Sequence, residues 1–361
     1  MECCVLKMFE GLDNQTLCVL LGRIKSIRAG LLGDICLDVY WEADMRLSEL
    51  SKETPHFPLP VIRERTSPGA GGNVAMNLAA LGVKMVQVIS VVGNDWRGDE
   101  LCKCFEEGGI GSKYILRDSS IVTNAYIKPL RSGISDVTYE DPRIDFSNYA
   151  PISVETENRL IEALDAVAPE LDVLCVSDQF RYGVVSERVQ KHLKILADQG
   201  LIVIADSRYN IGRFQGIYLK PNSSEALAAV GYETREEPSI EVCVDVADKL
   251  VKRGAHAVVM TIGAKGSLFY NGEAAILVPA HKVSGPVDIC GAGDTFLSGF
   301  AAALAAQATP CEAAALGGLC SEITIRQLGT TGTASPTQIS QWHNQINRPA
   351  DAAFTSEGGL K

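Results

Sequence analysis

The chain has 361 residues and a mass of 38.7 kDa, about two and a half times the length of an average domain, which excludes a small disulfide-stapled module. Hydrophobic residues make up 46% and charged residues 21%, so the chain can bury a sizeable core and is not globally disordered. The 33 Lys and Arg residues against 44 Asp and Glu give a net charge of −11, which opposes long-range attraction to nucleic acid or to an acidic membrane.

The cysteines and the amino terminus favour a soluble protein of the reducing cytoplasm. The 11 cysteines are odd in number, scattered and without a CxxC pair, so neither a disulfide framework nor a zinc ribbon is expected. Glu2, Glu10 and Asp13 interrupt the apolar amino terminus, which therefore lacks the pattern of an export signal. Apolar residues then recur at helical spacing, which predicts an amphipathic helix over residues 14–28. No stretch approaches the ~18 apolar residues that a transmembrane helix needs.

From about residue 29 to residue 335, strand-like apolar runs alternate with helical patterns. This alternation predicts a doubly wound, mostly parallel α/β sheet flanked by helices. The expected strands cover residues 29–37, 86–92, 173–177, 202–205, 257–261 and 266–270. The expected helices cover residues 73–81, 97–107, 156–167 and 186–199, and a short one begins at Pro336. The chain is expected to comprise an N-terminal helical extension (residues 1–28), a main domain (residues 29–345) and a flexible C-terminal tail (residues 346–361).

Two stretches, residues 39–67 and 121–147, interrupt this alternation. Both contain runs of β-forming composition, and insertions of this length after the strands of an α/β core commonly form a lid or a small second sheet over the site. We therefore expect a small β lid. A pair of ordinary surface loops is the alternative.

The strongest chemical motif is DICGAGD at residues 288–294, directly followed by a helix-forming run. The small residues Gly291, Ala292 and Gly293 let the chain turn into the helix and leave backbone N–H groups free to bind an anion. A carboxylate beside such an anion is unusual unless it takes a proton from a hydroxyl that attacks a phosphoryl group, so Asp294 is a candidate general base. The alternative is a capped helix in which Asp294 only stabilises the positive end of the dipole.

A second glycine motif, PGAGGNVAMN at residues 68–77, also opens a helix and lacks the Gly-Lys-Ser/Thr ending of a Walker A loop. It offers a polyhydroxyl ligand bare backbone and the side-chain amide of Asn73. Upstream, Asp34 and Asp38 follow a predicted strand, where open α/β sheets bind their ligands, and carboxylates accept paired hydrogen bonds from sugar hydroxyls. Each of the two could also be a simple loop acid.

The two glycine motifs, in this order across residues 29–335, resemble those of the ribokinase-type (PfkB) carbohydrate kinases. Within that family, GDICLDVYW at residues 33–41, the second glycine motif and RIDF at residues 143–146 are most similar to the heptose-7-phosphate kinase branch, the kinase domain of ADP-heptose synthase. The resemblance implies a ribokinase-like fold with a small β lid. It also implies transfer of the γ-phosphoryl group of MgATP to a hydroxyl of a sugar or sugar phosphate, with ATP and Mg²⁺ as cofactors.

The resemblance assigns roles around the acceptor. Asp294 would deprotonate the sugar hydroxyl, and the backbone amides of residues 291–293 would stabilise the transferring phosphoryl group. Arg143 could meet a phosphate on the substrate, because a guanidinium offers a bidentate fork. The residues that the resemblance implies for substrate binding are Asp34, Asp38, Gly71, Gly72, Asn73 and Arg143.

On the nucleotide side, KPNSSE at residues 220–225 matches the Asn-x-x-Glu segment of the family, in which Asn222 and Glu225 would orient magnesium largely through water. Arg208 could reach a nucleotide or substrate phosphate, or form a surface ion pair. Asp288 and the backbone after residues 329–332 fall where many family members hold a monovalent cation, for which K⁺ is the candidate. The TIGAKGS segment would cradle the phosphates and ribose, or form an ordinary glycine hairpin; its residues implied for this role are Thr261, Gly263 and Gly266.

Two departures from the family pattern, Gly318 and Glu322, fall near the expected adenine pocket. They motivate a second possibility, a non-catalytic sugar-binding regulator that kept the fold. A third is a kinase of a nucleoside or another small alcohol, since the motifs fix phosphoryl chemistry better than they fix the acceptor. Pairing of lid strands across a two-fold axis would make a homodimer, and no nucleic-acid or membrane partner is expected.

Overall fold

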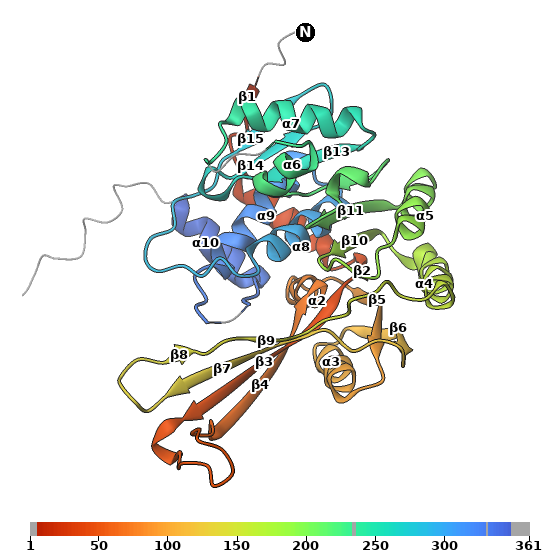
Figure 1. Cartoon of the computed structure of the whole chain (residues 1–361). Coiled ribbons are helices and arrows are strands. Elements are labelled where there is room, and N and C mark those ends of the chain that lie inside the picture. Colours follow the sequence, from red (N-terminus) through yellow and green to blue (C-terminus); the bar gives the residue numbers. More distant parts are fainter. Residues whose placement is uncertain (1–5, 233–235, 330, 348–361) are drawn as a thin grey trace, which may run out of the picture.

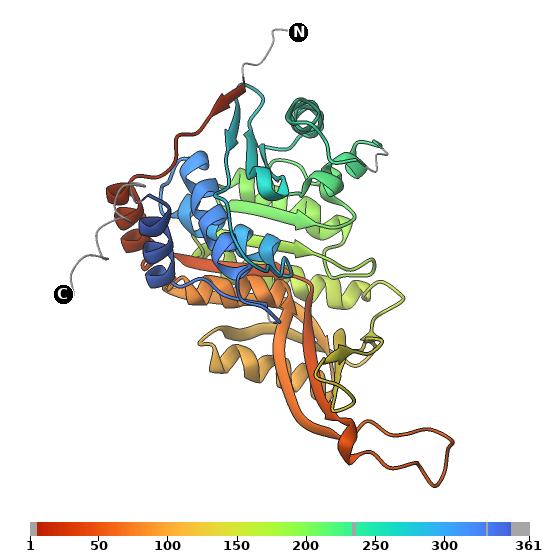
Figure 2. The same ribbon diagram turned by 90° about the vertical axis from the view of Figure 1, so that its left-hand side faces the viewer.

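The main sheet runs through the body of the protein and carries helices on both faces (Figures 1 and 2). The computed structural model describes residues 6–232, 236–329 and 331–347. Within this part of the chain, ten strands lie in the order β1-β15-β14-β13-β12-β11-β10-β2-β5-β6, and all are parallel except β14, which is antiparallel to both neighbours. The strands are β1 (Leu6–Met8), β2 (Arg28–Gly33), β5 (Met85–Gly93), β6 (Gly111–Asp118), β10 (Val173–Asp178), β11 (Ile202–Ser207), β12 (Tyr218–Leu219), β13 (Ala257–Thr261), β14 (Ser267–Tyr270) and β15 (Ala275–Val278).

The helices divide into two groups, one for each face of the sheet. Those whose buried residues join the first apolar core are α1 (Asn14–Ile24), α2 (Gly71–Ala80), α3 (Trp96–Glu107), α8 (Ala292–Ala305), α9 (Pro310–Thr324) and α10 (Pro336–Ile346). Those of the second core are α4 (Val154–Val167), α5 (Glu187–Asp198), α6 (Ser223–Ala229) and α7 (Ile240–Lys252). Short 3₁₀ turns cover Met45–Leu47, Ala168–Glu170, Ile211–Arg213 and Gly263–Lys265.

Strict alternation along the central strands produces these two cores. In β10, Val173 and Cys175 belong to one core, whereas Leu174 and Val176 belong to the other. Successive side chains of a strand point to opposite faces, so a strand that is apolar on both faces must be covered twice. The predicted doubly wound α/β sheet is thus confirmed.

The two segments that interrupt the alternation form a second sheet. Its order is β4-β3-β7-β8, and β9 also pairs with β7. It projects away from the main sheet, and with the connecting residues 45–60 we call it the lid (Figures 1 and 2). The expected small second sheet is present and the alternative of two surface loops is wrong. The lid strands are β3 (Ile35–Asp44), β4 (Val61–Ala70), β7 (Ala125–Ser132), β8 (Tyr139–Glu140) and β9 (Ile144–Phe146).

The junction between the two sheets corrects the first predicted strand. Residues 29–37 are not one strand, because β2 ends at Gly33 and β3 begins at Ile35 in the other sheet. Gly33 has a φ of 140°, and Ala70 at the return from the lid has a φ of 51°, a region that alanine rarely adopts. The backbone N–H of Gly71 donates to the carbonyl oxygen of Asp34 at 2.8 Å. The chain therefore enters and leaves the lid through two adjoining sharp turns.

The amino-terminal segment is part of the body of the protein. Helix α1 buries Leu17, Leu20, Leu21 and Ile24 in the core, as its periodicity predicts, but ends four residues early because residue 28 already starts β2. Strand β1, which the sequence pattern did not reveal, pairs with β15 at the edge of the main sheet. Among the described residues, no helix is both long and apolar enough to span a membrane. The predicted tail falls largely on residues 348–361, outside the described residues.

Candidate active site

The glycine turn before α8 has the geometry of an anion site. Gly291 is the residue before the helix and adopts a left-handed φ of 78°, which glycine tolerates without strain. A β-carbon at Gly291 would also lie 2.6 Å from the side-chain nitrogen Nδ2 of Asn73, too close for a side chain to fit. Helix α8 begins at Ala292, and the amides of Gly293 and Asp294 are at its first turn without an intrahelical partner, whereas the N–H of Ala292 donates to the carbonyl oxygen of Ile289 at 3.2 Å. The positive end of the dipole and these amides favour a negatively charged group.

Asp294 is held at this helix start by the second glycine motif. The Nδ2 of Asn73 donates to Oδ2 of Asp294 at 3.0 Å. Burial and the charge of Asp206 raise the pKa of Asp294 to about 7, against the lowering effects of Asn73, Lys220 and Arg208. A carboxyl group with a pKa near neutrality exists as both acid and base at physiological pH, which suits a general base.

Gly71, Gly72 and Asn73 are all buried at the first turn of α2. A side chain at Gly71 would meet the backbone of Asp34 at 2.6 Å, and one at Gly72 would meet Pro68 at 2.7 Å. These glycines therefore allow α2 to pack closely at the junction with the lid, which brings Asn73 to Asp294. Direct contact of the two glycines with a sugar stays a prediction.

Asp34 is enclosed by the protein's own backbone. Its side chain is 2% exposed, Oδ2 accepts hydrogen bonds from the N–H groups of Gln179 and Phe180, and Oδ1 accepts one from Val184, all at 2.8 Å. Burial and the charge of Asp178 raise the pKa of Asp34 to about 7. Both carboxylate oxygens are therefore already engaged, which favours a role in fixing the 178–184 loop over the predicted contact with substrate.

Asp38, on β3 of the lid, faces a lysine that the sequence analysis did not identify. The Nζ of Lys128, on β7, lies 3.3 Å from Oδ2 of Asp38 and 3.1 Å from the hydroxyl of Tyr40. Strands β3 and β7 run parallel, and Asp38 is in register with Tyr126, two residues before Lys128, which brings both side chains to one face. The Oδ1 atom of Asp38 is buried and has no hydrogen-bond partner. A buried carboxylate oxygen without a donor is a place for a ligand hydroxyl.

Arg143 lies close to Asp38. Its guanidinium stacks over the ring of Tyr126 at 4.1 Å and pairs with Asp145, with Nε 2.6 Å from Oδ1. The charge of Arg143 lowers the pKa of Asp38, although burial outweighs it and that pKa is raised. The ring of Phe180 packs edge-on against Tyr126. Arg143 is thus near Asp38, beside the rings of Tyr126 and Phe180.

The nucleotide-side residues lie at the ends of β12 and β13. Asn222 and Glu225 form a capping box at the start of α6. Oδ1 of Asn222 accepts a hydrogen bond from the backbone N–H of Glu225 at 2.9 Å, and Oε2 of Glu225 accepts one from the backbone N–H of Asn222 at 2.8 Å. Asn222 also forms a parallel β-bridge with Thr261. A side chain at Gly266, whose φ is 100°, would clash with the carbonyl oxygen of Val278, so the hairpin after Gly263 requires glycine. The predicted set is thus collected at one sheet edge.

A buried ion pair that the sequence did not point to lies between the two halves of the site. The Nζ of Lys220 is 2.9 Å from Oδ2 of Asp206, and both side chains are less than a tenth exposed. Burial lowers the pKa of Lys220, but the charges of Asp206, Glu225 and Asp294 outweigh burial and raise it, so the ammonium is charged. Arg208, directly after β11, is exposed, and its charge only partly opposes the rise in the pKa of Asp294 and of Glu225, which burial causes.

Asp288 braces the glycine turn. Its oxygens accept from the backbone N–H groups of Cys290 at 3.0 Å and Gly329 at 3.3 Å, and its own N–H donates to Ile325. Both oxygens are engaged in this way, so the carboxylate itself is a poor fit to a cation, and K⁺ binding stays a prediction. Of the residues named for that site, 330 lies outside the described ones. In the described part of the chain, no group of three or more His, Cys, Asp or Glu residues could hold a metal.

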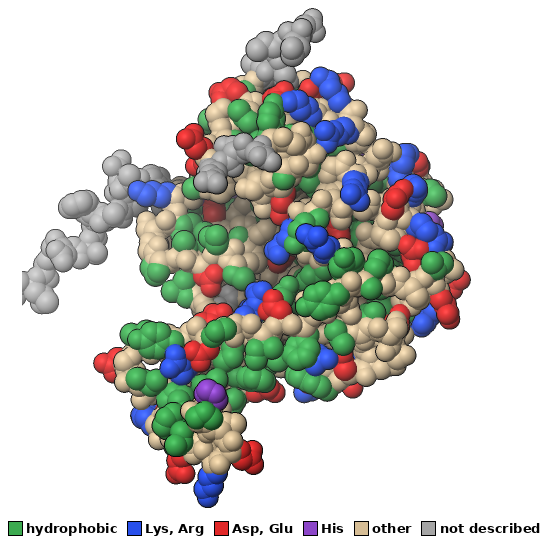
Figure 3. Space-filling model, in the orientation of Figure 1, with side chains coloured by type: hydrophobic (Ala, Val, Ile, Leu, Met, Phe, Trp, Pro, Cys, Tyr) green, Lys and Arg blue, Asp and Glu red, His purple; other side chains and the backbone are tan. Residues whose placement is uncertain are grey.

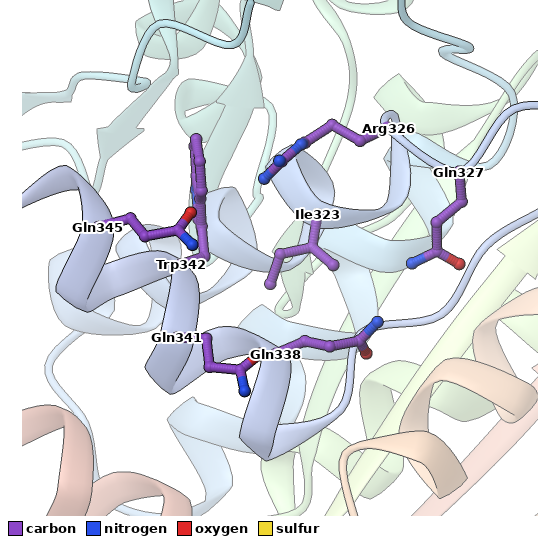
Figure 4. A pocket seen from close by; sticks show the side chains of 7 residues that line it. All are labelled: Ile323, Arg326, Gln327, Gln338, Gln341, Trp342 and Gln345. Carbon is purple, nitrogen blue, oxygen red and sulfur yellow. The ribbon is translucent and has the colours of Figure 1, made fainter.

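Glu322, which departs from the family pattern, has a structural role on α9. It is 5% exposed and accepts hydrogen bonds from the backbone N–H of His281 and the indole of Trp342, both at 2.7 Å. It thus fastens the segment after β15 to α9 and α10. A separate cavity of about 310 Å³ does not include Gly318; it is lined by Ile323 of α9, by Arg326 and Gln327 after that helix, and by residues of α10 such as Trp342 (Figure 4).

Comparison with known proteins agrees with this geometry. Residues 37–338 match the model of the pfkB family carbohydrate kinases. Three curated relatives, each a bifunctional protein HldE, come from Pelobacter propionicus, Citrifermentans bemidjiense and Geobacter sulfurreducens. They are 32%, 31% and 30% identical over 97%, 88% and 87% of this chain. The chain spans only 69%, 63% and 62% of their lengths.

Solved structures share the fold at lower identity. Ribokinase from Thermotoga maritima is 22% identical with a TM-score of 0.63, covering 88% of this chain and 99% of its own. Phosphofructokinase-2 from Escherichia coli, in complex with fructose-6-phosphate, is 20% identical with a TM-score of 0.68, covering 89% of this chain and 100% of its own. The predicted ribokinase-like fold and the predicted phosphotransferase acting on an alcohol group are both confirmed. The chain belongs to the pfkB family of carbohydrate kinases.

Proposed function

We propose that this protein transfers the γ-phosphoryl group of ATP to a hydroxyl of a sugar phosphate, with Asp294 as general base. The observation that carries the proposal is the contact between Asn73 and Asp294, which holds a carboxyl group of pKa about 7 at the amino end of α8. A phosphoryl group bound by the amides of the first turn would lie beside this carboxylate. Asp294 would then take the proton of the attacking hydroxyl.

The lid supplies the acceptor side. The free Oδ1 of Asp38 can accept a hydrogen bond from a hydroxyl, and two cations, Lys128 paired with Asp38 and Arg143 paired with Asp145, lie beside it. A neutral sugar needs neither charge, whereas a phosphate is recognised by such cations. These charges therefore support a phosphorylated acceptor, and the relatives' heptose-7-phosphate kinase branch makes a heptose 7-phosphate the first candidate.

Glu225 keeps a side-chain oxygen for magnesium, whereas the only side-chain oxygen of Asn222 already accepts a hydrogen bond from the protein. Each uses one side-chain oxygen to cap α6, which leaves the second oxygen of Glu225 for a water-retaining ion, and Mg²⁺ favours such sparse oxygen ligation. When bound, magnesium would offset the negative charge of the nucleotide phosphates. Thr261, Gly263 and Gly266 would contact the nucleotide from the neighbouring hairpin, with Arg208 at its exposed side.

The substrate assignment is tested by ADP release from MgATP with matched acceptors: heptose 7-phosphate, fructose 6-phosphate, the free sugars and a set of nucleosides. We expect turnover with a sugar phosphate and at least tenfold lower kcat/KM with the corresponding free sugar, since each decade corresponds to ~1.4 kcal/mol of lost transition-state binding. Turnover with nucleosides alone would contradict the proposal.

We also propose that the lid forms a homodimer. Its outer parts expose large apolar side chains, and Figure 3 shows hydrophobic side chains gathered there. Contiguous exposed apolar patches usually mark an interface. Sedimentation of the full chain should give a dimer, and a monomer at all concentrations would contradict this proposal. The exposed side chains are Leu47, Leu50, Phe57, Val61, Ile62, Ile134, Val137, Tyr139 and Ile144.

A further inference from the structure

Lys220 connects the end of the main sheet to the glycine turn. It directly follows β12, is 2% exposed, and its backbone N–H donates to the carbonyl oxygen of Ala205 at 2.8 Å. Its ammonium pairs with Asp206 at 2.9 Å. A methyl group added at Gly293 would lie 3.4 Å from Nζ, so the ammonium lies next to the turn. A buried charge is thus placed beneath the candidate anion site.

Stability alone does not account for a lysine at this position. Taking an ammonium and a carboxylate out of water costs several kcal/mol per ion, and buried pairs of this kind are often replaced by apolar residues without loss of stability. An ammonium has three N–H donors. Asp206 is the one carboxylate within ion-pair distance of Lys220 among the residues that the structure describes, so donors remain for an anion.

The surrounding charges make a cation necessary for phosphoryl transfer. Asp206, Glu225 and Asp294 all interact electrostatically with Lys220, and their carboxylates would repel an incoming phosphate. Arg208 is exposed, so water screens its charge, whereas Lys220 acts at low dielectric and at a fixed position. Preorganised charges of this kind stabilise a transferring group most effectively.

We propose that Lys220 donates hydrogen bonds to the γ-phosphoryl group during its transfer and that Asp206 holds the ammonium in place, an inference that rests on the proposed kinase function. The bond from the γ-phosphorus to its bridging oxygen breaks, leaving ADP, and a bond from the acceptor oxygen to phosphorus forms. The hydroxyl proton passes to Asp294. Lys220 keeps its protons and contacts the non-bridging oxygens throughout.

The test compares binding of MgADP alone with binding of MgADP plus aluminium fluoride, which mimics the transferring phosphoryl group. For Lys220→Met we expect MgADP affinity within about threefold of wild type, and an affinity for the aluminium fluoride complex lower by about 100-fold, as for other deleted transition-state donors. The kcat with heptose 7-phosphate should fall by the same factor. Lys220→Arg should recover part of both. The inference is overturned if Lys220→Met binds the fluoride complex as wild type does, or loses MgADP equally.

Two further variants keep this test decisive. The double variant Lys220→Met with Asp206→Asn removes both charges of the pair, so it should fold if the single variant does not, and should show the same selective loss. Lys249→Met is the matched control, because Lys249 pairs with Asp245 at 2.8 Å on the exposed face of α7 and should change neither affinity. Wild type that binds the fluoride complex but phosphorylates no sugar phosphate would overturn the proposed substrate, while the affinity difference still decides the role of Lys220.

Discussion

The two sheets of this protein contribute to one site in different ways. The main sheet is parallel, buried on both faces and rich in short glycine turns, and it supplies Asp294, Asn222, Glu225 and Lys220 from strand ends and helix starts. The lid is a small, partly exposed sheet, and it supplies Asp38 and Lys128 from the middle of long strands. On the proposed function the two sheets would have separate tasks: backbone turns fixed by the core would bind the phosphoryl group, and side chains on the lid would select the acceptor.

The main-sheet half is tested most severely by Asp294→Asn. Asparagine keeps the shape and the contact with Asn73 but cannot accept the hydroxyl proton, so kcat should fall by about 10²–10⁴-fold. Calorimetry should show MgADP and acceptor binding within a few fold of wild type. Turnover within tenfold of wild type would show that another group is the base.

The lid half is tested by Lys128→Met. Because Lys128 would meet the acceptor and not the nucleotide, KM for the sugar phosphate should rise by about 10–100-fold, the cost of one charge-assisted hydrogen bond to phosphate, with MgADP affinity unchanged. Lys113→Met is the control. Like Lys128, Lys113 lies over a tyrosine ring, 5.0 Å from the centroid of Tyr114, but it is on β6, away from the site. Equal losses for the free sugar and the sugar phosphate would argue against phosphate recognition.

The pH dependence of kcat/KM tests the main-sheet half through Asp294. Burial and Asp206 raise the pKa of Asp294 to about 7, and Asp294 must be deprotonated to act as a base. Therefore kcat/KM should be at its plateau above that pH and decrease as pH falls through 7, by about tenfold per unit well below it. Initial rates between pH 5.5 and 9 at constant ionic strength check this. A flat profile would contradict the assigned base.

The smallest effect concerns the junction. Ala70 has φ 51° and ψ −129°, a strained conformation for alanine that glycine adopts freely. Ala70→Gly should therefore raise the free energy of unfolding by about 1 kcal/mol in urea melts. Ala79→Gly, within α2, is the opposite control and should lower it by a similar amount. A destabilised Ala70→Gly variant would mean that the turn is not strained.

The sequence predicted the parts of the molecule that depend on local patterns. Alternation of apolar runs revealed the parallel sheet, and the two glycine motifs pointed to Asp294 and Asn73, which the fold brings together from positions 221 residues apart. Strand β1 has only three residues, all of them exposed, which is too short a run to predict a strand, and it is formed by pairing with β15. The break after Gly33 was missed because apolar residues continue through it into the lid.

The residues missed at the site share one property. Lys128 and Lys220 are single lysines whose partners, Asp38 and Asp206, lie 90 and 14 residues away, and no spacing along the chain marks such a pair. Conversely, Asp34 has the position of a ligand-binding acid, yet three backbone N–H groups enclose it. Side-chain partners of this kind become visible only once the strands are placed in register.

The central claim is transfer of a phosphoryl group to a sugar phosphate, and its most direct test is product analysis. The protein would be incubated with heptose 7-phosphate and MgATP labelled at the γ-phosphorus, and the sugar products separated. Our account predicts a labelled sugar bisphosphate whose formation is lost with Asp294→Asn. Bound ATP with no labelled sugar product from any sugar phosphate tested would contradict it.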